Sequence, residues 1–412
     1  MATLRWIAGA KLVTDVWTLT LSGTVTSQTY TITIGSRTIT YVSGGASTVA
    51  QILAALLALW NSVSEPAPPE FKELTATGGV TDIVLTGRVT GRPHVVSFTA
   101  SGLATIASTN TVAASGPNFR NVGANWTGGS APANGDTLVY DSGNVPCKYG
   151  MSAALTTLTT KIEPGYSGTI GLPDTNTDGG AYREYRTASY TQEGGNLTVN
   201  SPNVSLVRAA FGTTAFTARV IQTGRRLDGN IPVVLFTGGA ASSECNVSRG
   251  DVGLAFFAGE TCTCPTIRVS YISQQASDAK VICGTGLTTT TITKSGGTLE
   301  LNGNATTITQ DVKGGATTIQ AGAFTTINVN GGKLAYNSTG TATTINVRND
   351  GEVSFEGDPR GKTLTNPINV YGASAMVRDG AKSVNSGVLS LVLVGTPVSN
   401  ITHGLSNTVS LT

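Results

Sequence analysis

The chain has 412 residues, more than one compact core usually holds, so we expect at least two structural units. Only 12% of the residues are charged, 39% are hydrophobic and 51 are glycines, a balance that excludes a disordered chain and is typical of β-solenoids and fibrous proteins. The formal net charge is +2 and no Lys/Arg cluster is interleaved with aromatic residues, so the composition gives no sign of a nucleic-acid partner.

The N-terminal sequence MATLRWIAGAKLVTDVW lacks a sustained apolar stretch and does not resemble a secretory signal. The most apolar segment, residues 49–60, is too short to cross a bilayer, so we expect neither a transmembrane span nor a membrane partner. These features predict a protein that is assembled in the cytoplasm, or exported only inside a larger particle.

Residues 1–106 are predicted to form a small α+β sandwich with one helix laid on an antiparallel sheet. The helix is expected to begin at Ser47 or Thr48 and to end before Pro66. Alternating apolar and polar residues predict strands at 16–23, 28–35, 37–42, 71–77, 81–88 and 94–101. The apolar stripe of the helix indicates core packing, with membrane docking as the alternative, and consists of Val49, Ile52, Leu53, Leu56, Leu59, Trp60 and Val63.

Residues 107–118, ASTNTVAASGPN, are interpreted as a linker, and residues 119–155 as a connecting β segment. Seven aromatic residues gather between positions 126 and 190. They indicate either a shoulder that packs between two units or a surface that stacks on sugars or docks a partner. These residues are Trp126, Tyr140, Tyr149, Tyr166, Tyr182, Tyr185 and Tyr190.

A repeated phrase with a Thr-Thr-Ile core dominates residues 286–356. It recurs at steps of 16, 19 and 18 residues, at Ile292, Ile308, Ile327 and Ile345. Each copy has the pattern of a strand, a Gly-containing turn and a strand, and one copy cannot bury its apolar side alone. Stacked copies can, so we predict a mainly β protein in which residues 156–412 form a right-handed parallel β-helix, a β-solenoid with coils of about 18 residues, ending in a C-terminal capping segment.

The cysteine pattern does not indicate a zinc knuckle, because Cys262 and Cys264 have only one residue between them. We interpret the thiols as small core residues in successive coils, with a disulfide or a metal site as alternatives. The five cysteines are Cys147, Cys245, Cys262, Cys264 and Cys283.

The sharpest local signal for a ligand is the heptapeptide DTNTDGG. Its residues Asp174, Asn176 and Asp178, followed by Gly, match the first half of a calcium loop, in which alternate oxygens converge on one cation. The closing ligand is out of place, because the twelfth position is Tyr185 and Glu184 lies one residue short. The sequence therefore offers a candidate calcium site, or else an Asx-turn loop that binds nothing. No other cofactor is expected.

The alternative of a glycan-cleaving enzyme requires two carboxylates across a groove. The acidic residues of the clearest coils are scattered and expected on turns, and a composite pair from other coils stays open. The first group is Glu300, Asp311, Glu352, Glu356 and Asp358, and the second is Glu184, Asp228, Glu244, Asp251 and Glu260. His403 is expected on a solvated turn.

Several blocks carry a resemblance to a known group of proteins. The chain opens with LRWIAGAKLVTDVWTLTLSGTV and VAQILAALLALWN, continues with NFRNVGANWTGGSAPANGDTLVYDSG and YSGTIGLPDTNTDGGAYREYR, and reaches GGTLELNGNATTITQ. In this order the blocks resemble structural proteins encoded by tailed phages and prophages, over most of the chain. The resemblance implies a virion component of the capsid-decorating, fibre or spike type, without a catalytic set.

We therefore expect a non-catalytic structural protein of a phage virion, assembled in the host cytoplasm. Its expected partners are other virion proteins, namely major capsid or tail proteins, and further copies of itself, with a trimer as one candidate. Contact with a host glycan is left open. The alternatives are a polysaccharide-degrading tailspike and a bacterial surface adhesin or filament subunit.

Overall fold

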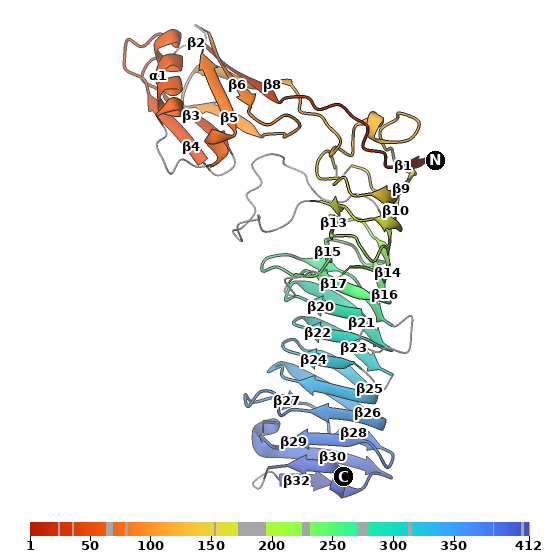
Figure 1. Cartoon of the computed structure of the whole chain (residues 1–412). Helices are drawn as coiled ribbons and strands as arrows, with labels where there is room; N and C mark the ends of the chain where they lie inside the picture. Colours follow the sequence, from red (N-terminus) through yellow and green to blue (C-terminus); the bar gives the residue numbers. More distant parts are fainter. Residues whose placement is uncertain are drawn as a thin grey trace.

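A computed structural model shows a small domain at one end of a long rod of stacked strands (Figure 1). It describes residues 1–23, 25–34, 37–62, 69–78, 81–151, 154–171, 195–224, 231–270, 279–311, 315–381, 383–404 and 408–411. The protein is mainly β. Its described helices are α1 (Val49–Asn61), the four-residue α2 (Pro69–Lys72) and the 3-10 turns η1 (Gly123–Asn125), η2 (Asn385–Gly387) and η3 (Val398–Asn400).

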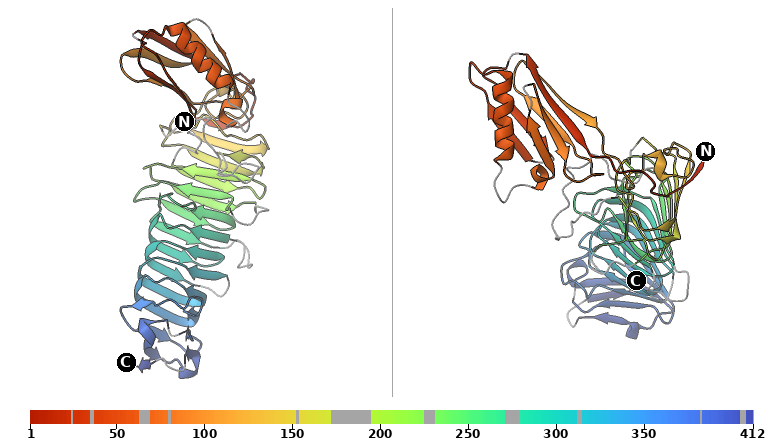
Figure 2. Two further views of the ribbon diagram at one scale, coloured as in Figure 1. Left: turned by 90° about the vertical axis from the view of Figure 1, so that its left-hand side faces the viewer. Right: turned by 45° about the horizontal axis from the view of Figure 1, so that its top comes forward.

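The rod is a β-solenoid, because its strands pair in parallel with the strands of the preceding and following coils (Figure 2). The first ladder runs through β1 (Thr3–Arg5), β9 (Thr137–Gly143), β10 (Thr159–Tyr166), β12 (Asn196–Asn200), β14 (Thr217–Gln222), β16 (Glu244–Val247), β19 (Thr266–Val269), β21 (Leu287–Lys294), β23 (Asn304–Gln310), β25 (Phe324–Tyr336), β26 (Thr341–Ser354), β28 (Ile368–Tyr371), β30 (Val388–Val394) and β32 (Thr408–Leu411).

Two further ladders complete each coil. The second ladder runs through β11 (Thr169–Ile170), β13 (Leu206–Ala210), β15 (Val234–Thr237), β17 (Gly250–Leu254), β20 (Ala279–Cys283), β22 (Thr298–Leu301), β24 (Ala316–Ile319), the later parts of β25 and β26, β29 (Met376–Asp379) and β31 (Ile401–His403). The third, shorter ladder contains β18 (Cys262–Thr263), the first residues of β21, β23, β25 and β26, and β27 (Thr363–Leu364).

The stacking predicted from the repeat is confirmed, because Ile308 pairs with Ile292 on one side and with Ile327 on the other. These isoleucines belong to one buried interior column that follows the first ladder. The column consists of Leu4, Leu138, Thr160, Leu197, Ala218, Cys245, Ile267, Ile292, Ile308, Ile327, Ile345, Ile368 and Leu391. Coils of about 18 residues hold only for the clear repeats, since the step from Ile345 to Ile368 is 23 residues.

The rod begins earlier in the chain than the sequence indicated. Residues 3–5, expected inside the sandwich, form β1 and pair in parallel with β9, so that Leu4 lies beside Leu138. The sandwich is therefore an insertion between the first two strands of the solenoid. A three-residue strand carries too little periodicity to be recognised, and only the free edge of β9 identifies its partner.

Aromatic side chains close the interior of the rod at this end. Trp6 and Trp126 form an antiparallel bridge, and their ring centroids are 5.0 Å apart in an edge-to-face contact. The ring of Tyr140 lies 5.6 Å from that of Trp6 and 5.5 Å from that of Trp126. Tyr166 follows in the next coil, 5.3 Å from Tyr140. Because Trp126, Tyr140 and Tyr166 are fully buried, they are core residues rather than an exposed platform for sugars.

The sandwich contains two antiparallel sheets and the predicted helix. One sheet has the order β5 (Leu74–Gly78), β6 (Asp82–Gly87), β2 (Val16–Gly23) and β8 (Ala104–Val112), and the other the order β4 (Arg37–Val42), β3 (Thr29–Ile34) and β7 (Val96–Ala100). Helix α1 begins as predicted, with Thr48 and Gln51 forming a reciprocal capping box. Four residues of its stripe are buried in the core and Leu59 is partly exposed. Val63 lies outside the described residues.

Two predicted boundaries in this domain differ from the structure. Residues 107–112, interpreted as part of a linker, belong to β8 and pair with residues 16–20 of β2. Their Ser, Thr and Asn composition is typical of loops, but the open edge of β2 provides hydrogen-bond partners that the local sequence does not reveal. Phe71 and Lys72, expected in a strand, lie in α2 before β5 begins.

Two chain crossings connect the sandwich with the rod, residues 7–15 outward and residues 112–119 on the return. The side chain of Asn125, which is fully buried, joins them. Its Oδ1 accepts a hydrogen bond from the Ala10 amide at 2.8 Å, and its Nδ2 donates to the Phe119 carbonyl at 2.7 Å. Asn125 therefore ties the outward and returning segments together at this end of the rod.

A buried ionic cluster holds the base of the sandwich, where β2 begins. Asp15 accepts hydrogen bonds from Trp17 Nε1 at 3.0 Å, from Asn110 Nδ2 at 2.9 Å and from His94 Nδ1 at 3.1 Å. Burial by itself lowers the pKa of His94, but Asp15 and Glu73, which lies 3.6 Å from His94 Nε2, outweigh it and leave the pKa raised. Burial by itself raises the pKa of Asp15, and its hydrogen bonds leave the pKa lowered.

The C-terminal residues continue the rod. The expected capping segment instead supplies β30, β31 and β32, which extend the first and second ladders. Among the helices that the structure describes, none has the length and apolar character needed to cross a membrane.

Candidate functional site: a polar groove across four coils

The residues of the predicted calcium loop, Asp174, Asn176 and Asp178, lie outside the described residues, so this prediction is not tested. The same holds for Glu184, Asp228, Tyr182, Tyr185 and Tyr190. Within the part of the chain that the structure describes, no three His, Cys, Asp or Glu side chains are grouped so that they could hold a metal ion.

Several of the candidate carboxylates engage basic side chains. Glu244 lies 3.2 Å from Arg268 and Glu352 lies 2.9 Å from Arg378, and each of these pairs joins neighbouring coils. Glu260 lies 2.7 Å from Arg208, which belongs to the coil two steps earlier. Asp358 pairs with Arg360, and Asp311 accepts a hydrogen bond from Asn330 at 2.8 Å. Of the remaining candidates, Asp251 lies on β17 and Glu300 on β22, both in the second ladder, and Glu356 follows β26. This pattern links coils and does not place two acids across the groove described below.

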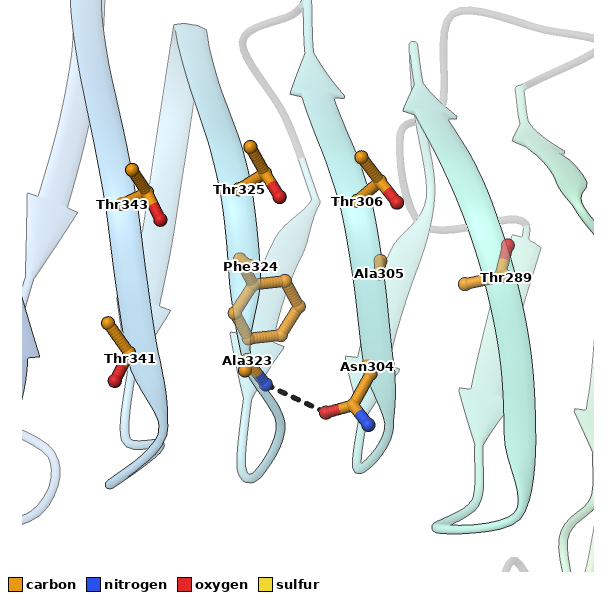
Figure 3. A pocket seen from close by; sticks show the side chains of 9 residues that line it. All are labelled: Thr289, Asn304, Ala305, Thr306, Ala323, Phe324, Thr325, Thr341 and Thr343. Atoms are coloured by element: carbon orange, nitrogen blue, oxygen red, sulfur yellow. Dashed lines mark hydrogen bonds between the residues drawn. The ribbon is translucent and has the colours of Figure 1, made fainter.

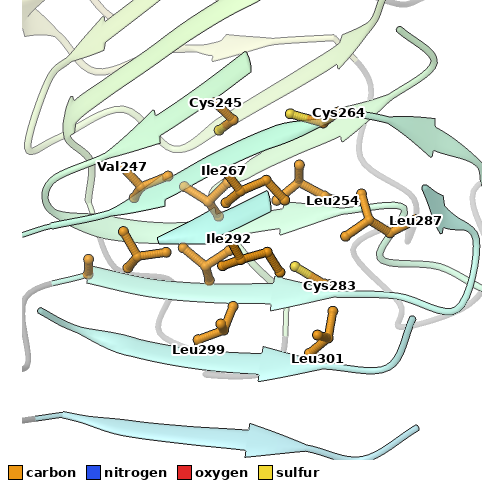
Figure 4. Packing of buried hydrophobic residues seen from close by; sticks show 14 of the residues in the cluster. Cys245, Val247, Leu254, Cys264, Ile267, Cys283, Leu287, Ile292, Leu299 and Leu301 are labelled. Atoms are coloured by element: carbon orange, nitrogen blue, oxygen red, sulfur yellow. The ribbon is translucent and has the colours of Figure 1, made fainter. Parts of the chain in front are cut away.

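All five cysteines lie in the described part of the chain, where they are buried and form no disulfide, which confirms their interpretation as core residues. Figure 4 shows Cys245, Cys264 and Cys283 among the aliphatic side chains of the interior. Burial, reinforced by the Glu260 carboxylate, raises the pKa of Cys262 to about 12. Burial also raises the pKa of Cys245, Cys264 and Cys283. Because the thiolate is the reactive form, these thiols are chemically quiet at neutral pH.

The interior also contains polar residues that sequence analysis did not single out. Lys294 is fully buried, and burial lowers its pKa to about 8. It is paired in register with Gln310, whose Nε2 donates to the Gly331 carbonyl at 2.6 Å and whose Oε1 accepts from Thr317 Oγ1 at 2.5 Å. These contacts satisfy Gln310 inside the rod, where water does not reach.

A surface groove crosses four consecutive coils on the third ladder (Figure 3). Its volume is about 330 Å³. It is lined by Thr289, Asn304, Ala305, Thr306, Ala323, Phe324, Thr325, Thr341 and Thr343. All nine side chains are uncharged, and six of them carry a hydroxyl or an amide group.

The hollow exists because one coil has a short side chain. Asn304, Ala323 and Thr341 occupy equivalent outward positions in successive coils, and Ala323 leaves a gap between its longer neighbours. Close stacking of the adjacent corner is possible because Gly322 and Gly340 have no side chain. A Cβ on Gly340 would approach the Gly322 carbonyl oxygen to 2.1 Å.

The floor of the groove is apolar and belongs to the core. Ala305 and Phe324 point inward at the intervening positions, with exposed fractions of 4% and 3%. The ring of Phe324 meets that of Tyr336 edge to face, with centroids 6.1 Å apart. Burial of Phe324 therefore fixes the neighbouring residues Ala323 and Thr325 at the groove surface.

The polar side chains of the groove differ from those of the first ladder. On the first ladder, Asn346 donates to Asn328 at 2.9 Å and accepts from Asn369 at 2.9 Å, so that these amides satisfy one another along the rod. In the groove, no described protein group bonds to the side-chain hydroxyls of Thr306, Thr325, Thr341 and Thr343. The asparagine side chains of the first ladder stabilise the stack of coils, whereas the threonine hydroxyls of the groove are available to a ligand.

This groove was not predicted from the sequence. The signal was present as the triplets NAT, AFT and TAT, which immediately precede the Thr-Ile cores and place two outward residues around one inward residue. Their alignment into one surface depends on the register between coils. No family model matches the chain, and neither a curated protein nor a solved structure matches it.

Proposed function

We propose that this chain is a non-catalytic structural protein of a phage virion, which decorates the particle or projects from it. The observation that carries the proposal is the continuous solenoid, whose first strand precedes the sandwich and whose later strands follow it. A rod of this kind holds an attached domain at a defined distance.

The dimensions support a spacer. From Leu4 to Leu391 the interior column contains 13 stacked residues, and 12 steps of about 4.8 Å give a length of about 60 Å. Each step is held by backbone hydrogen bonds to the neighbouring coils, so the rod resists bending more than a single chain does.

In this proposal the sandwich is the attachment module and contacts a major capsid or tail protein. The resemblance of the opening and middle blocks to tailed-phage structural proteins supports the virion setting. Right-handed winding and assembly of several copies, for example as a trimer, belong to the same proposal. The virion would be assembled in the host cytoplasm.

Quantitative mass spectrometry of particles purified from the producing culture tests this proposal, with copy number referenced to the shell protein. Hundreds of copies per particle would support capsid decoration, and a few copies would support a fibre or spike. Absence of the protein from purified particles would contradict the virion role and favour a bacterial surface adhesin or filament subunit.

The polysaccharide-degrading alternative is tested with the same purified protein. A depolymerase assay on capsular polysaccharide of the producing strain should show no loss of viscosity. Cleavage would overturn the non-catalytic proposal, and the pairing of Glu244, Glu260 and Glu352 with arginines makes these acids poor candidates for the chemistry.

A further inference from the structure

We propose that the groove over β21, β23, β25 and β26 binds a neutral polysaccharide strand, which lies along the rod across successive coils. This inference does not depend on the virion role, because it concerns what the rod surface binds and not where the rod resides.

The lining selects an uncharged ligand. Its nine residues provide hydroxyl, amide and apolar groups and no charge. A carboxylated or phosphorylated ligand would lose hydration on binding without gaining a counter-ion from the groove. A neutral sugar offers many hydroxyls, each of which donates and accepts hydrogen bonds as threonine hydroxyls do.

The spacing selects a polymer. Thr306, Thr325 and Thr343 point the same way from three consecutive coils (Figure 3). Neighbouring strands lie about 4.8 Å apart, so hydroxyls recur at that interval along the rod. A ligand with hydroxyls repeated along its length can engage several coils, whereas a small ligand engages only one or two.

The coils are also preorganised. The backbone of each outward threonine is held by a buried neighbour, as that of Thr325 is by Phe324, and therefore loses little conformational freedom on binding. At Asn304, the Oδ1 atom already accepts a hydrogen bond from the Ala323 amide at 2.8 Å. That contact holds the side chain at the groove edge and leaves its Nδ2 group to donate outward.

The hollow at Ala323 provides space for a sugar ring. The whole groove, of which this hollow is one part, has a volume of about 330 Å³, at the small end of the range for ligand sites, roughly 300–1,000 Å³. The methyl group of Ala323 offers an apolar contact for the carbon face of a ring, while Asn304 and Thr341 flank it with polar groups. The groove therefore combines a short apolar contact with hydrogen bonds on both sides.

Isothermal titration calorimetry on the full chain tests this inference. The probes are cellohexaose, maltohexaose and chitohexaose, with hexagalacturonate as the charged comparison. We expect at least one neutral hexasaccharide to bind with a Kd below about 1 mM, and hexagalacturonate to bind at least tenfold more weakly.

Two variants locate the site. Ala323→Phe fills the hollow and should weaken binding at least tenfold, while Thr325→Val removes one hydroxyl and should weaken it about fivefold, as expected for one lost hydrogen bond. The matched control is Thr318→Phe, which adds the same ring at an outward position of β24, on the second ladder of the same region, and should leave binding unchanged.

Four results would overturn the inference: no neutral hexasaccharide binds, hexagalacturonate binds best, Ala323→Phe binds as tightly as the wild type, or Thr318→Phe weakens binding equally. Circular dichroism establishes whether each variant is folded. If Ala323→Phe does not fold, Thr325→Val decides, and unchanged affinity in that variant contradicts the proposal.

Discussion

Truncation of one isoleucine in the interior column should destabilise the rod locally. Ile308 is fully buried between Ile292 and Ile327. Ile308→Ala removes three buried carbons, worth about 2.4 kcal/mol at about 0.8 kcal/mol each. The cavity that remains between rigid coils raises the cost to about 3–4 kcal/mol.

The loss should be confined to neighbouring coils, because each coil of a solenoid contacts mainly the coils before and after it. Native-state hydrogen exchange measured by mass spectrometry follows this directly. We expect amide protection to fall in β21, β23 and β25 and to stay unchanged in the sandwich, whose core is a separate cluster. The rod need not unfold in one step, so a single melting temperature is a poorer measure.

The matched control is Thr309→Ala, which changes the next residue along the strand on the outward side. Thr309 Oγ1 accepts a hydrogen bond from Asn328 at 3.3 Å, so its loss should cost about 0.5–1 kcal/mol. The reasoning would be refuted if both variants lost equal protection, or if Ile308→Ala exposed the sandwich amides as much as the coils.

Three other changes probe separate parts of the molecule. Thr48→Ala removes the capping box of α1 and should lower sandwich stability by about 1 kcal/mol in chemical denaturation, whereas no change would show that the cap contributes nothing. Trp126→Ala removes one ring of the buried cluster of Trp6, Trp126 and Tyr140 and should lower the local stability of the rod by about 3–5 kcal/mol. Hydrogen exchange should then show lost amide protection in β1 and β9 but not in β28 and β30. His94→Gln removes the cation beside Asp15 and Glu73. Because the pKa of His94 is raised, its stabilisation is complete below about pH 6.5 and is lost as pH rises through the higher folded-state pKa. The melting temperature of the sandwich should therefore fall more at pH 6 than at pH 10, and an equal fall at both would contradict an ionic role.

Local patterns predicted much of the secondary structure. The strands at residues 16–23 and 37–42 match β2 and β4, and the helix begins at its predicted cap. These elements are set by alternation and capping within a few residues. Strands whose partners are distant in sequence were harder, as β1 and β8 show, because their residues become strands only through the edges of β9 and β2.

The same contrast between local pattern and distant contacts applies to the candidate site. The sequence shows residue types with recognisable chemistry, such as the acids and the thiols, but not their surroundings. The structure places Glu244, Glu260 and Glu352 in ion pairs and the described cysteines in the core. The groove residues are ordinary threonines, asparagines and alanines, and nothing in one triplet distinguishes a binding surface from a loop.

The amino-acid sequence alone is enough to show that this protein is built by repetition. The spacing of Ile292, Ile308 and Ile327 requires stacking, because one copy cannot bury its apolar side. The tertiary structure alone decided where the rod begins, which side chains close its end and where a groove forms. The physical reason is register: pairing between coils brings together residues such as Leu4 and Leu138 that are far apart along the chain, and no local pattern specifies that pairing.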